Sequence, residues 1–490
     1  MLNKRKRGEA EAVSSSSMES QTADMSGSQQ VEPAKSGTRQ CCRRYRLRND
    51  VQVNRWRGVR PLELRDSLDH SWLKQFPLST RGRHIMNRLG NRFRLIGVNW
   101  YGASDAYNVV GGLDVQTLEI ICETVQQLGF NVVRLPFSNE MLRSSVAAGA
   151  VNFALNPQLR DLTPLQVLDE VIHCLGRYRI AVILNNHTTY SEWCGAPDRN
   201  GLWWDPASST FSVEQWLEDW AMLATRYALW PHVVGYDLRN EVRPCPPSSF
   251  TSPWLWWPSL GSLRWPRLLR SLGGCDWASA AAAAAERVRA APSGASKLIV
   301  IERIVWPAQS LHAYTKCPGP FLPCFSGQLV LGVHHYSWSG PGRYLAFGGP
   351  PNLKCLSGIL RRLGIFSKAN YGDMSRQSLF EELSRQWGFC LDEDICPVWV
   401  SEFGGNDGSA DEMRWLRMFI DFLVEKDADW AYWPLNVGPK PDSGNDEPYG
   451  MLSAEWMPKG AAVKSKSDGG MTATDTRLDL LERAGLRSTL

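Results

Sequence analysis

The sequence predicts an α/β protein built as a closed (β/α)8 barrel, the TIM barrel. Short β-rich runs alternate with helical patterns from residue 85 onward, which is typical of a parallel sheet covered by helices. Eight such units fall within roughly 370 residues, and this number and length suit a barrel better than an open sheet. An open doubly wound sheet with insertions is the alternative that the pattern leaves.

The individual elements follow from the periodicity of the apolar residues. Residues 118, 121, 122, 125 and 128, for example, repeat at the three-and-four spacing of a helix, and Pro136 is expected to end the second strand. We expect strands at 95–100, 131–136, 180–184, 233–238, 298–301, 329–333, 398–401 and 430–435. We expect helices at 113–128, 165–175, 213–229, 277–291, 376–387 and 411–425.

Three segments do not fit the barrel pattern. Residues 1–50 are rich in Ser, Gln, Glu, Lys and Arg and are expected to be a disordered tail. Residues 244–275 are rich in Trp, Pro and Leu and are expected to be an insertion after strand four of the catalytic domain, which we place at 51–458. Residues 459–490 are polar and poorly defined, and only three leucines near 480 suggest a short helix, so a last barrel helix is not expected.

The composition excludes several classes of protein. The formal net charge of the 490 residues is +4, and no basic stripe runs through the chain, so a dedicated nucleic-acid binder is not expected. No run of eighteen apolar residues predicts a membrane span. The twelve cysteines have no metal-ligand spacing, so no zinc site is expected. Cys317 with Cys324, and Cys390 with Cys396, are near enough in sequence to form disulfides or to remain buried thiols.

The N-terminus leaves the compartment unknown. The first thirty residues lack the apolar stretch of a secretory signal. The basic run from Lys4 to Arg7 is either a solvated charge cluster or a nuclear address. One feature of the composition points to sugars: the chain has 22 tryptophans, whose flat rings suit the faces of sugar rings as well as protein cores.

Polar and aromatic residues follow the predicted strands where a barrel gathers its functional side chains, at the carboxyl ends. Two of them are carboxylates, Glu241 after strand four and Glu402 after strand seven. Strands four and seven face each other across an eight-stranded barrel, so the two carboxyl groups should meet over its axis. The other candidate residues at these ends are Arg134, His187, Asn240, His334, Tyr336 and Trp433.

A carboxyl pair at this place suits the cleavage of a glycosidic bond. The leaving oxygen needs a proton, and the oxocarbenium-like transition state needs a nearby negative charge. One carboxylic acid and one carboxylate supply both. Groups about 5 Å apart predict direct attack with retention of configuration, whereas a wider gap predicts attack by water with inversion.

The ordered motifs around these residues resemble family 5 of the glycoside hydrolases, the cellulase family, and in particular its plant and fungal cellulase-like members. The resemblance runs over residues 85–457. It is carried by Asn99-Trp100, Val133-Arg134-Leu135-Pro136, His187, Leu238-Arg239-Asn240-Glu241, His334-His335-Tyr336, Ser401-Glu402-Phe403-Gly404 and Trp430-Ala431-Tyr432-Trp433. The loop from Trp193 to Trp204 and the segment from Asp446 to Leu452 resemble the same members.

The resemblance implies a role for each candidate. Glu241 would be the general acid/base and Glu402 the nucleophile, oriented and kept ionised by Arg134 and Tyr336. Asn240 would bind the sugar 2-hydroxyl, His187 and His334 would line the same subsite, and Trp433 would form the floor under the sugar ring. The resemblance implies no metal and no organic cofactor. The expected partner is a β-linked oligo- or polysaccharide, and we expect a monomer.

The sequence departs from the family pattern in places, and two other functions stay open. Strand five ends in Glu302-Arg303 where the family has Glu-Gly, and we expect Glu302 and His335 to be structural. The leading hypothesis is a retaining hydrolase of β-linked glucan or mannan. The alternatives are a β-glucosidase acting on a glucosylated lipid or sterol, suggested by the apolar 244–275 insertion, and a catalytically inactive sugar-binding barrel.

Overall fold

A computed structural model describes residues 56, 58–194, 201–205, 207–242, 277–302, 325, 327–340, 370–436, 448–458 and 476–487. The expected tail at 1–50, the insertion at 244–275, Arg303, Cys317 and Cys324 lie outside these residues. Cys390 and Cys396 lie within them, and both are buried free thiols.

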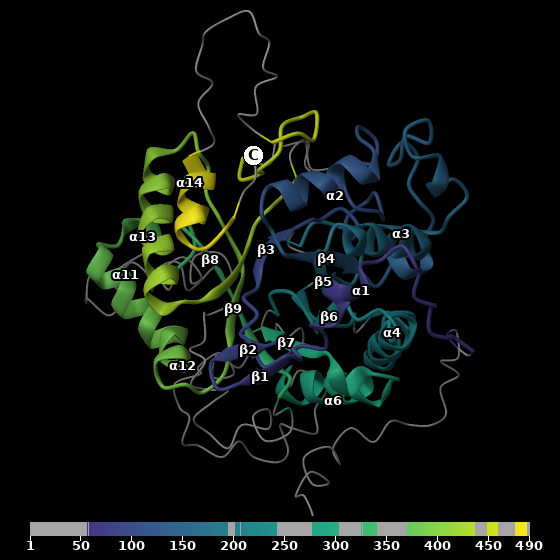
Figure 1. The fold of residues 1–490 in the computed structure, drawn as a ribbon, viewed down its shortest axis with the longest axis horizontal. Coiled ribbons are helices and arrows are strands. Elements are labelled where there is room, and N and C mark those ends of the chain that lie inside the picture. The colour runs from purple at the N-terminus through teal and green to yellow at the C-terminus, as the bar shows by residue number, and fades with distance from the viewer. Residues whose placement is uncertain are drawn as a thin grey trace, which may run out of the picture.

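Eight parallel strands close into a barrel, so the predicted fold class is confirmed (Figure 1). Their hydrogen-bonded order follows the sequence and closes where the last strand pairs with the first. The strands are β3 (Ile96–Asn99), β4 (Val132–Ser138), β5 (Ala181–Thr188), β6 (Val233–Asp237), β7 (Leu298–Glu302), β8 (Leu329–Tyr336), β9 (Val398–Gly404) and β10 (Asp429–Tyr432).

Helices surround the barrel and cover its outer face (Figure 1). Each helix that follows a strand brings the chain back to the start of the next parallel strand. The described helices are α1 (His70–Leu73), α2 (Leu118–Gln127), α3 (Pro164–Arg177), α4 (Val213–Arg226), α6 (Trp277–Ala290), α11 (Arg376–Leu383), α12 (Phe389–Asp392), α13 (Ala410–Lys426) and α14 (Thr476–Arg483). None of these helices is long and apolar enough to cross a membrane.

The apolar residues of each strand alternate between two cores. Val133 and Val182 belong to the large core between the barrel and its helices, whereas Val132 and Ala181 belong to the core inside the barrel. This alternation is expected for strands whose successive side chains point to opposite faces. The inner core also contains apolar residues of α1 and of the hairpin formed by β1 (Ser79–Arg81) and β2 (His84–Met86).

Several predicted boundaries were wrong. The helix expected from residue 113 begins at Leu118, where the side chain of Thr117 caps it by accepting the N–H of Ile120. The second barrel strand does not end at Pro136 but continues to Ser138. Pairing of β4 with β3 stops at Arg134, so the missing N–H of Pro136, which would face β3, interrupts no ladder.

The C-terminal segment contains the helix that the three leucines suggested, and the expectation that no last barrel helix exists was wrong. Helix α14 lies beside α13 (Figure 1), and the indole N–H of Trp430 donates to the carbonyl of Ala484 at 3.1 Å. Arg477 is fully buried and donates to the carbonyls of Tyr449 and Gly450. The sequence obscured this helix because its polar residues outnumber its apolar ones.

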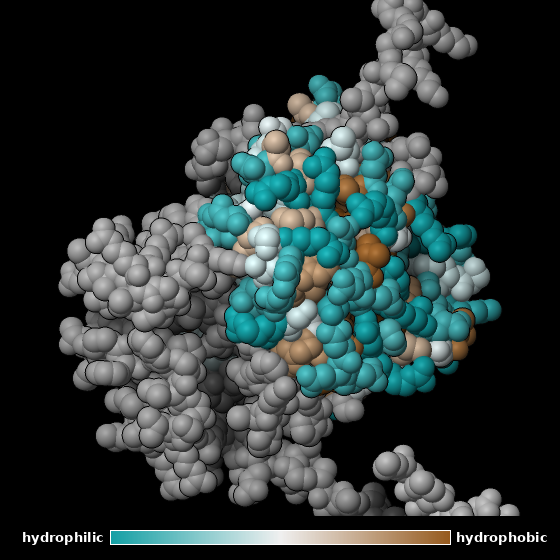
Figure 2. Space-filling model, turned by 90° about the vertical axis from the view of Figure 1, so that its left-hand side faces the viewer, coloured by the Kyte–Doolittle hydropathy of each residue, from teal (hydrophilic) through white to brown (hydrophobic). Residues whose placement is uncertain are grey.

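Figure 2 shows a face of the molecule that is mainly hydrophilic, with hydrophobic residues dispersed between polar ones. Dispersed apolar residues of this kind are ordinary on a solvated surface.

Candidate active site

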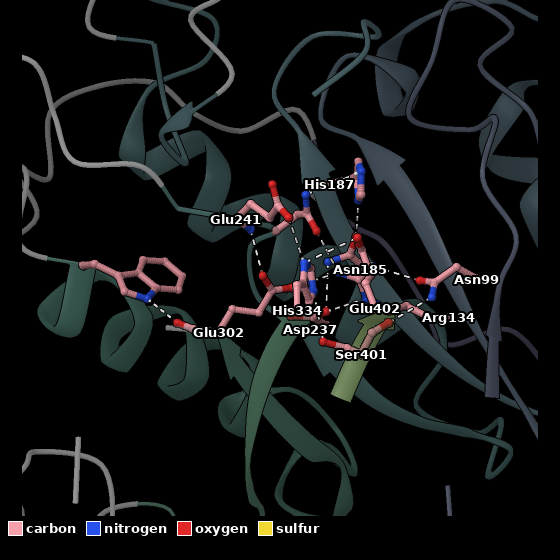
Figure 3. A network of polar contacts seen from close by, with 12 residues as sticks. Asn99, Arg134, Asn185, His187, Asp237, Glu241, Glu302, His334, Ser401 and Glu402 are labelled. Carbon is pink, nitrogen blue, oxygen red and sulfur yellow. Dashed lines mark hydrogen bonds and ion pairs between the residues drawn. The ribbon is translucent and has the colours of Figure 1, made fainter. Parts of the chain in front are cut away.

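The eight predicted site residues come together in the upper part of the barrel, toward the carboxyl ends of its strands. Figure 3 shows Arg134, His187, Glu241, His334 and Glu402 among them. Four of them lie inside strands that are longer than predicted: His187 in β5, His334 and Tyr336 in β8, and Glu402 in β9. The sequence placed Arg134 at the end of its strand, but in the structure it lies in the middle of β4. The strands extend because ladder hydrogen bonds continue to Thr188, Tyr336 and Gly404.

Arg134 is the centre of the site. Its guanidinium group is fully buried and donates to three carboxylates: Asp237 at 2.8 Å, Glu302 at 2.8 Å and Glu402 at 2.5 Å. It also donates to the side-chain oxygens of Asn99 and Asn240, each at 2.9 Å. Burial by itself would lower the pKa of Arg134, but the three carboxylates raise it well above its ordinary value.

Glu402 accepts two hydrogen bonds and has an ionic contact with a third residue. Arg134 binds one carboxylate oxygen, the hydroxyl of Tyr336 donates to the other at 3.0 Å, and Nδ1 of His334 lies 3.4 Å from that second oxygen. Burial raises the pKa of Glu402 above its ordinary value, while His334 and Arg134 oppose this rise by favouring the ionised form. The contacts therefore offset part of the cost of a buried charge.

His334 connects the two predicted catalytic carboxylates. Its Nδ1 lies 3.0 Å from Glu241 as well as 3.4 Å from Glu402, and its Nε2 lies 3.1 Å from Ser401 and 3.3 Å from Glu302. Burial would lower the pKa of His334, but the neighbouring carboxylates raise it to about 10. A protonated imidazole with two N–H donors fits these contacts. The register between β8 and β9 shifts between Val333 and His334, so that Ser401 is an extra residue of β9 directly before Glu402.

Glu241 follows β6 and is more accessible than Glu402, with its side chain 20% exposed against 5%. Its backbone has φ of 40°, in the left-handed region that non-glycine residues rarely adopt. Its N–H donates to Glu302 at 2.8 Å. Such conformations cluster at functional sites because the surrounding contacts must hold them in place.

The distance between the two carboxyl groups is short. One ligand atom from each of Glu241, His334 and Glu402 lies within 4.8 Å of the other two. The same three groups could in principle hold a metal ion, but both nitrogens of His334 are engaged with carboxylates and a hydroxyl. A protonated histidine is not a metal ligand, so the arrangement fits a bridged pair of carboxyl groups better.

The remaining predicted residues surround this pair. Asn240 accepts from Arg134, and its amide nitrogen lies 3.5 Å from Nε2 of His187. The ring of Trp433 lies parallel to those of His187 and Tyr101, with centroids 5.5 Å and 5.2 Å away. Trp433 is 4% exposed, so the structure places it within an aromatic cluster at the site.

His335, the second histidine of the pair, was expected to be structural and points elsewhere. Its Nε2 accepts the indole N–H of Trp387 at 2.8 Å, and the residue is fully buried.

Sequence reasoning missed parts of the network. Asp237 received no role, yet it accepts from Arg134 and from Asn185, and burial together with the charge of Glu302 raises its pKa to about 8. Burial would raise the pKa of Glu302 as well, but His334 and Arg134 lower it to about 2. The sequence did contain a signal for both residues: β6 and β7 each end in an acidic residue that follows a mainly apolar run.

A parallel barrel with a close carboxyl pair above strands four and seven of eight defines the class of glycoside hydrolases with this fold. The model of the cellulase family, glycosyl hydrolase family 5, matches residues 90–438. The chain belongs to this family and is a glycosidase of the cellulase type.

Relatives include an endoglucanase of Paenibacillus polymyxa, 27% identical over 77% of this chain and 82% of that protein. A glycosyl hydrolase 5 family protein of the plant Chamaecyparis obtusa is 27% identical over 78% of this chain and 63% of its own length. Among solved structures, an endocellulase of Pyrococcus horikoshii matches with a TM-score of 0.59 and 22% identity, covering 84% of this chain and 99% of that chain. The catalytic domain of the major endoglucanase of Xanthomonas campestris matches with a TM-score of 0.57 and 23% identity, and the match covers 83% of this chain and 99% of that chain.

Proposed function

We propose that this glycosidase cleaves β-1,4-linked glucan with retention of anomeric configuration, through a covalent glycosyl-enzyme. The observation that carries the proposal is the short gap between Glu241 and Glu402, whose oxygens approach within 4.8 Å. Retaining enzymes have carboxyl groups about 5–5.5 Å apart, whereas inverting enzymes need about 6.5–9.5 Å to admit a water molecule.

In the first step, a carboxylate oxygen of Glu402 attacks the anomeric carbon while Glu241 gives its proton to the glycosidic oxygen. The bond to the leaving sugar breaks, and the glycosyl group is esterified to Glu402. In the second step, Glu241 takes a proton from water as the water oxygen attacks the same carbon and releases Glu402. The greater exposure of Glu241 suits this exchange with water.

The residues around Glu402 support its assignment as the nucleophile. Arg134 and Tyr336 occupy its two oxygens and favour the ionised form that attacks. Asn240, fixed by Arg134 at 2.9 Å, is assigned to the 2-hydroxyl of the sugar, and Trp433 to the face of the ring.

The choice of glucan over mannan rests on the relatives, whose names are those of endoglucanases and endocellulases. Structures of the Pyrococcus horikoshii endocellulase include complexes with cellotetraose. The 244–275 insertion that suggested a glucosylated lipid lies outside the described residues, so no observation on the described part of the chain favours that alternative.

Initial rates on cellotetraose, barley β-glucan, mannotetraose and glucosylceramide would test the substrate. We expect turnover of the two glucans, and mannotetraose or glucosylceramide as the sole substrate would contradict the proposal. Proton NMR of the first product formed from cellotetraose should show the β-anomer before mutarotation, and a first product in the α form would contradict retention.

Two variants would test the assignment of roles. Glu402→Ala should lose turnover by more than about 10⁴-fold while remaining folded, and azide should restore cleavage of an activated aryl β-cellobioside to give the α-glycosyl azide. Glu241→Ala with azide should give the β-glycosyl azide, because Glu402 still forms the covalent intermediate. Retained hydrolysis in Glu402→Ala would refute the assignment of Glu402 as the nucleophile.

A further inference from the structure

Glu302, the last residue of β7, contacts both halves of the site. One carboxylate oxygen accepts from Arg134 at 2.8 Å and lies 3.3 Å from Nε2 of His334. The other oxygen accepts the backbone N–H of Glu241 at 2.8 Å. Figure 3 shows this side chain reaching from β7 to Glu241 on one side and to His334 and Arg134 on the other. Glu302 is 1% exposed, so substrate would meet Glu241 before it meets Glu302.

The contact with Glu241 falls where the backbone needs it. Glu241 has φ of 40°, and a glutamate in this left-handed conformation persists only where surrounding contacts hold it. A carboxylate that accepts the N–H of that residue makes a short, charge-assisted hydrogen bond. Glu302 also adjoins His334, whose other nitrogen contacts the Glu241 carboxyl at 3.0 Å. The backbone and the side chain of Glu241 are therefore both tied to Glu302.

The barrel makes room for Glu302 and anchors it. Gly332 pairs with Glu302 in register on the neighbouring strand β8, and a Cβ at Gly332 would lie 2.9 Å from Cγ of Glu302. Such a contact is too close for carbon atoms, so a side chain at residue 332 would displace the glutamate. On the outer side, Trp277 of α6 donates its indole N–H to the Glu302 carbonyl at 3.0 Å.

Asp237 provides a natural comparison within the same network. It is likewise buried, lies at the end of the neighbouring strand β6, and accepts from Arg134 at 2.8 Å. Its other hydrogen bond is to Asn185, and in the part of the chain that the structure describes it has none to Glu241. Asp237 thus shares with Glu302 the hydrogen bond from Arg134, which also binds Glu402, but it lacks the hydrogen bond from the backbone of Glu241.

We propose that Glu302 is a positioning residue for protonation of the leaving group, because it fixes the backbone of Glu241 and, through His334, its carboxyl group. This inference rests on the proposed function, in which Glu241 is the acid. It replaces the expectation that Glu302 is only structural. Loss of Glu302 should therefore impair the step that needs the proton more than the attack by Glu402.

Leaving groups of different acidity separate these two effects. A 2,4-dinitrophenyl leaving group departs without protonation, whereas the sugar alcohol released from cellotetraose needs the proton. kcat/KM reports the first glycosyl transfer for both substrates. For Glu302→Gln we expect a loss of about 100-fold on cellotetraose, the size typical of a misplaced catalytic group, and less than about 5-fold on 2,4-dinitrophenyl β-cellobioside.

Asp237→Asn is the matched control, since it removes one buried carboxylate from the same arginine. It should slow both substrates by similar factors. Gly332→Ala is a second variant that displaces Glu302 without removing its charge, and it should reproduce the selective loss on cellotetraose. Thermal denaturation would establish that each variant is folded, and Gly332→Ala decides the matter if Glu302→Gln does not fold.

Glu241→Ala serves as the reference for loss of the acid. If Glu241→Ala shows the selective loss but the folded Glu302 or Gly332 variant slows both substrates equally, the positioning inference is overturned and the proposed function stands. If Glu241→Ala itself slows both substrates equally, Glu241 is not the acid and the proposed function fails. The inference is supported if Glu241→Ala and Glu302→Gln lose kcat/KM mainly on cellotetraose, while Asp237→Asn loses it to a similar extent on both substrates.

Discussion

The hydroxyl of Tyr336 offers a clean test of how the site keeps Glu402 ionised. It donates to Glu402 at 3.0 Å, and the ring is stacked on Trp338 and Tyr449 with centroid distances of 5.1 Å and 6.0 Å. Tyr336→Phe keeps this stacking and removes only the donor. The second oxygen of Glu402 then retains His334, at 3.4 Å, as its partner.

The magnitude follows from the strength of the lost hydrogen bond. A hydrogen bond to a charged group contributes about 1.5–3 kcal/mol, and a shift of one pH unit in a titration corresponds to about 1.4 kcal/mol. Burial already raises the pKa of Glu402, and loss of a donor to its ionised form raises it further. Attack requires the carboxylate, so the acid limb of the kcat/KM profile should move to higher pH by about one to two pH units.

The assay is the pH dependence of kcat/KM on cellotetraose, between pH 3 and 9, for the wild type and Tyr336→Phe. Tyr432→Phe is a suitable control, because this side chain is buried in the core between the barrel and its helices and its hydroxyl donates to the carbonyl of Tyr449 at 3.0 Å. The control should leave the acid limb in place. An unmoved acid limb in Tyr336→Phe would refute the argument that its hydroxyl stabilises the ionised nucleophile.

Three further predictions concern stability. His334 has a pKa raised from an unfolded value of about 6.5 to about 10, so its contribution is complete below the lower value and lost as pH rises through the upper one. The difference in melting temperature between wild type and His334→Asn should therefore be largest below pH 6.5 and should disappear as the pH approaches 10. A difference that stays constant with pH would contradict this. Gly112→Ala should destabilise by about 2–4 kcal/mol in urea unfolding, because φ is 90° and the added Cβ would lie 2.3 Å from the ring of Trp456; an unchanged midpoint would show that the ring yields. Arg477→Ala should cost about 3 kcal/mol, because it removes the charged donor to the carbonyls of Tyr449 and Gly450, the second of them buried. Protease should then cut near α14 first, and a digestion pattern like that of the wild type would contradict this.

The sequence alone determined the barrel and the identity of the carboxyl pair. Strand periodicity is a local property, and each of the eight strands falls on an apolar run that the sequence makes visible. Glu241 and Glu402 could be paired because parallel strands bring all their carboxyl ends to one face. The family resemblance then gave Arg134, Tyr336 and His334 as their partners.

The ends of the elements were less visible, because they depend on neighbours distant in the chain. Pro136 lies inside a strand only because β3 stops pairing before it. Thr117 caps the start of α2, but several other polar residues nearby in the sequence are also candidates for this cap. Helix α14 is held by Arg477 and Trp430, whose partners cannot be read from a polar C-terminal sequence.

Only the tertiary structure decided how the charges are shared. Three carboxylates meet one arginine because β4, β6, β7 and β9 converge, and no sequence spacing reports that Glu302 accepts the N–H of Glu241. The sequence by itself determined the candidate catalytic residues, since their types and strand positions are local. The three-dimensional packing brought the carboxyl groups within 4.8 Å of each other and gave Glu302 its contact with Glu241, since both depend on distances between strands that the chain connects only through the closed barrel.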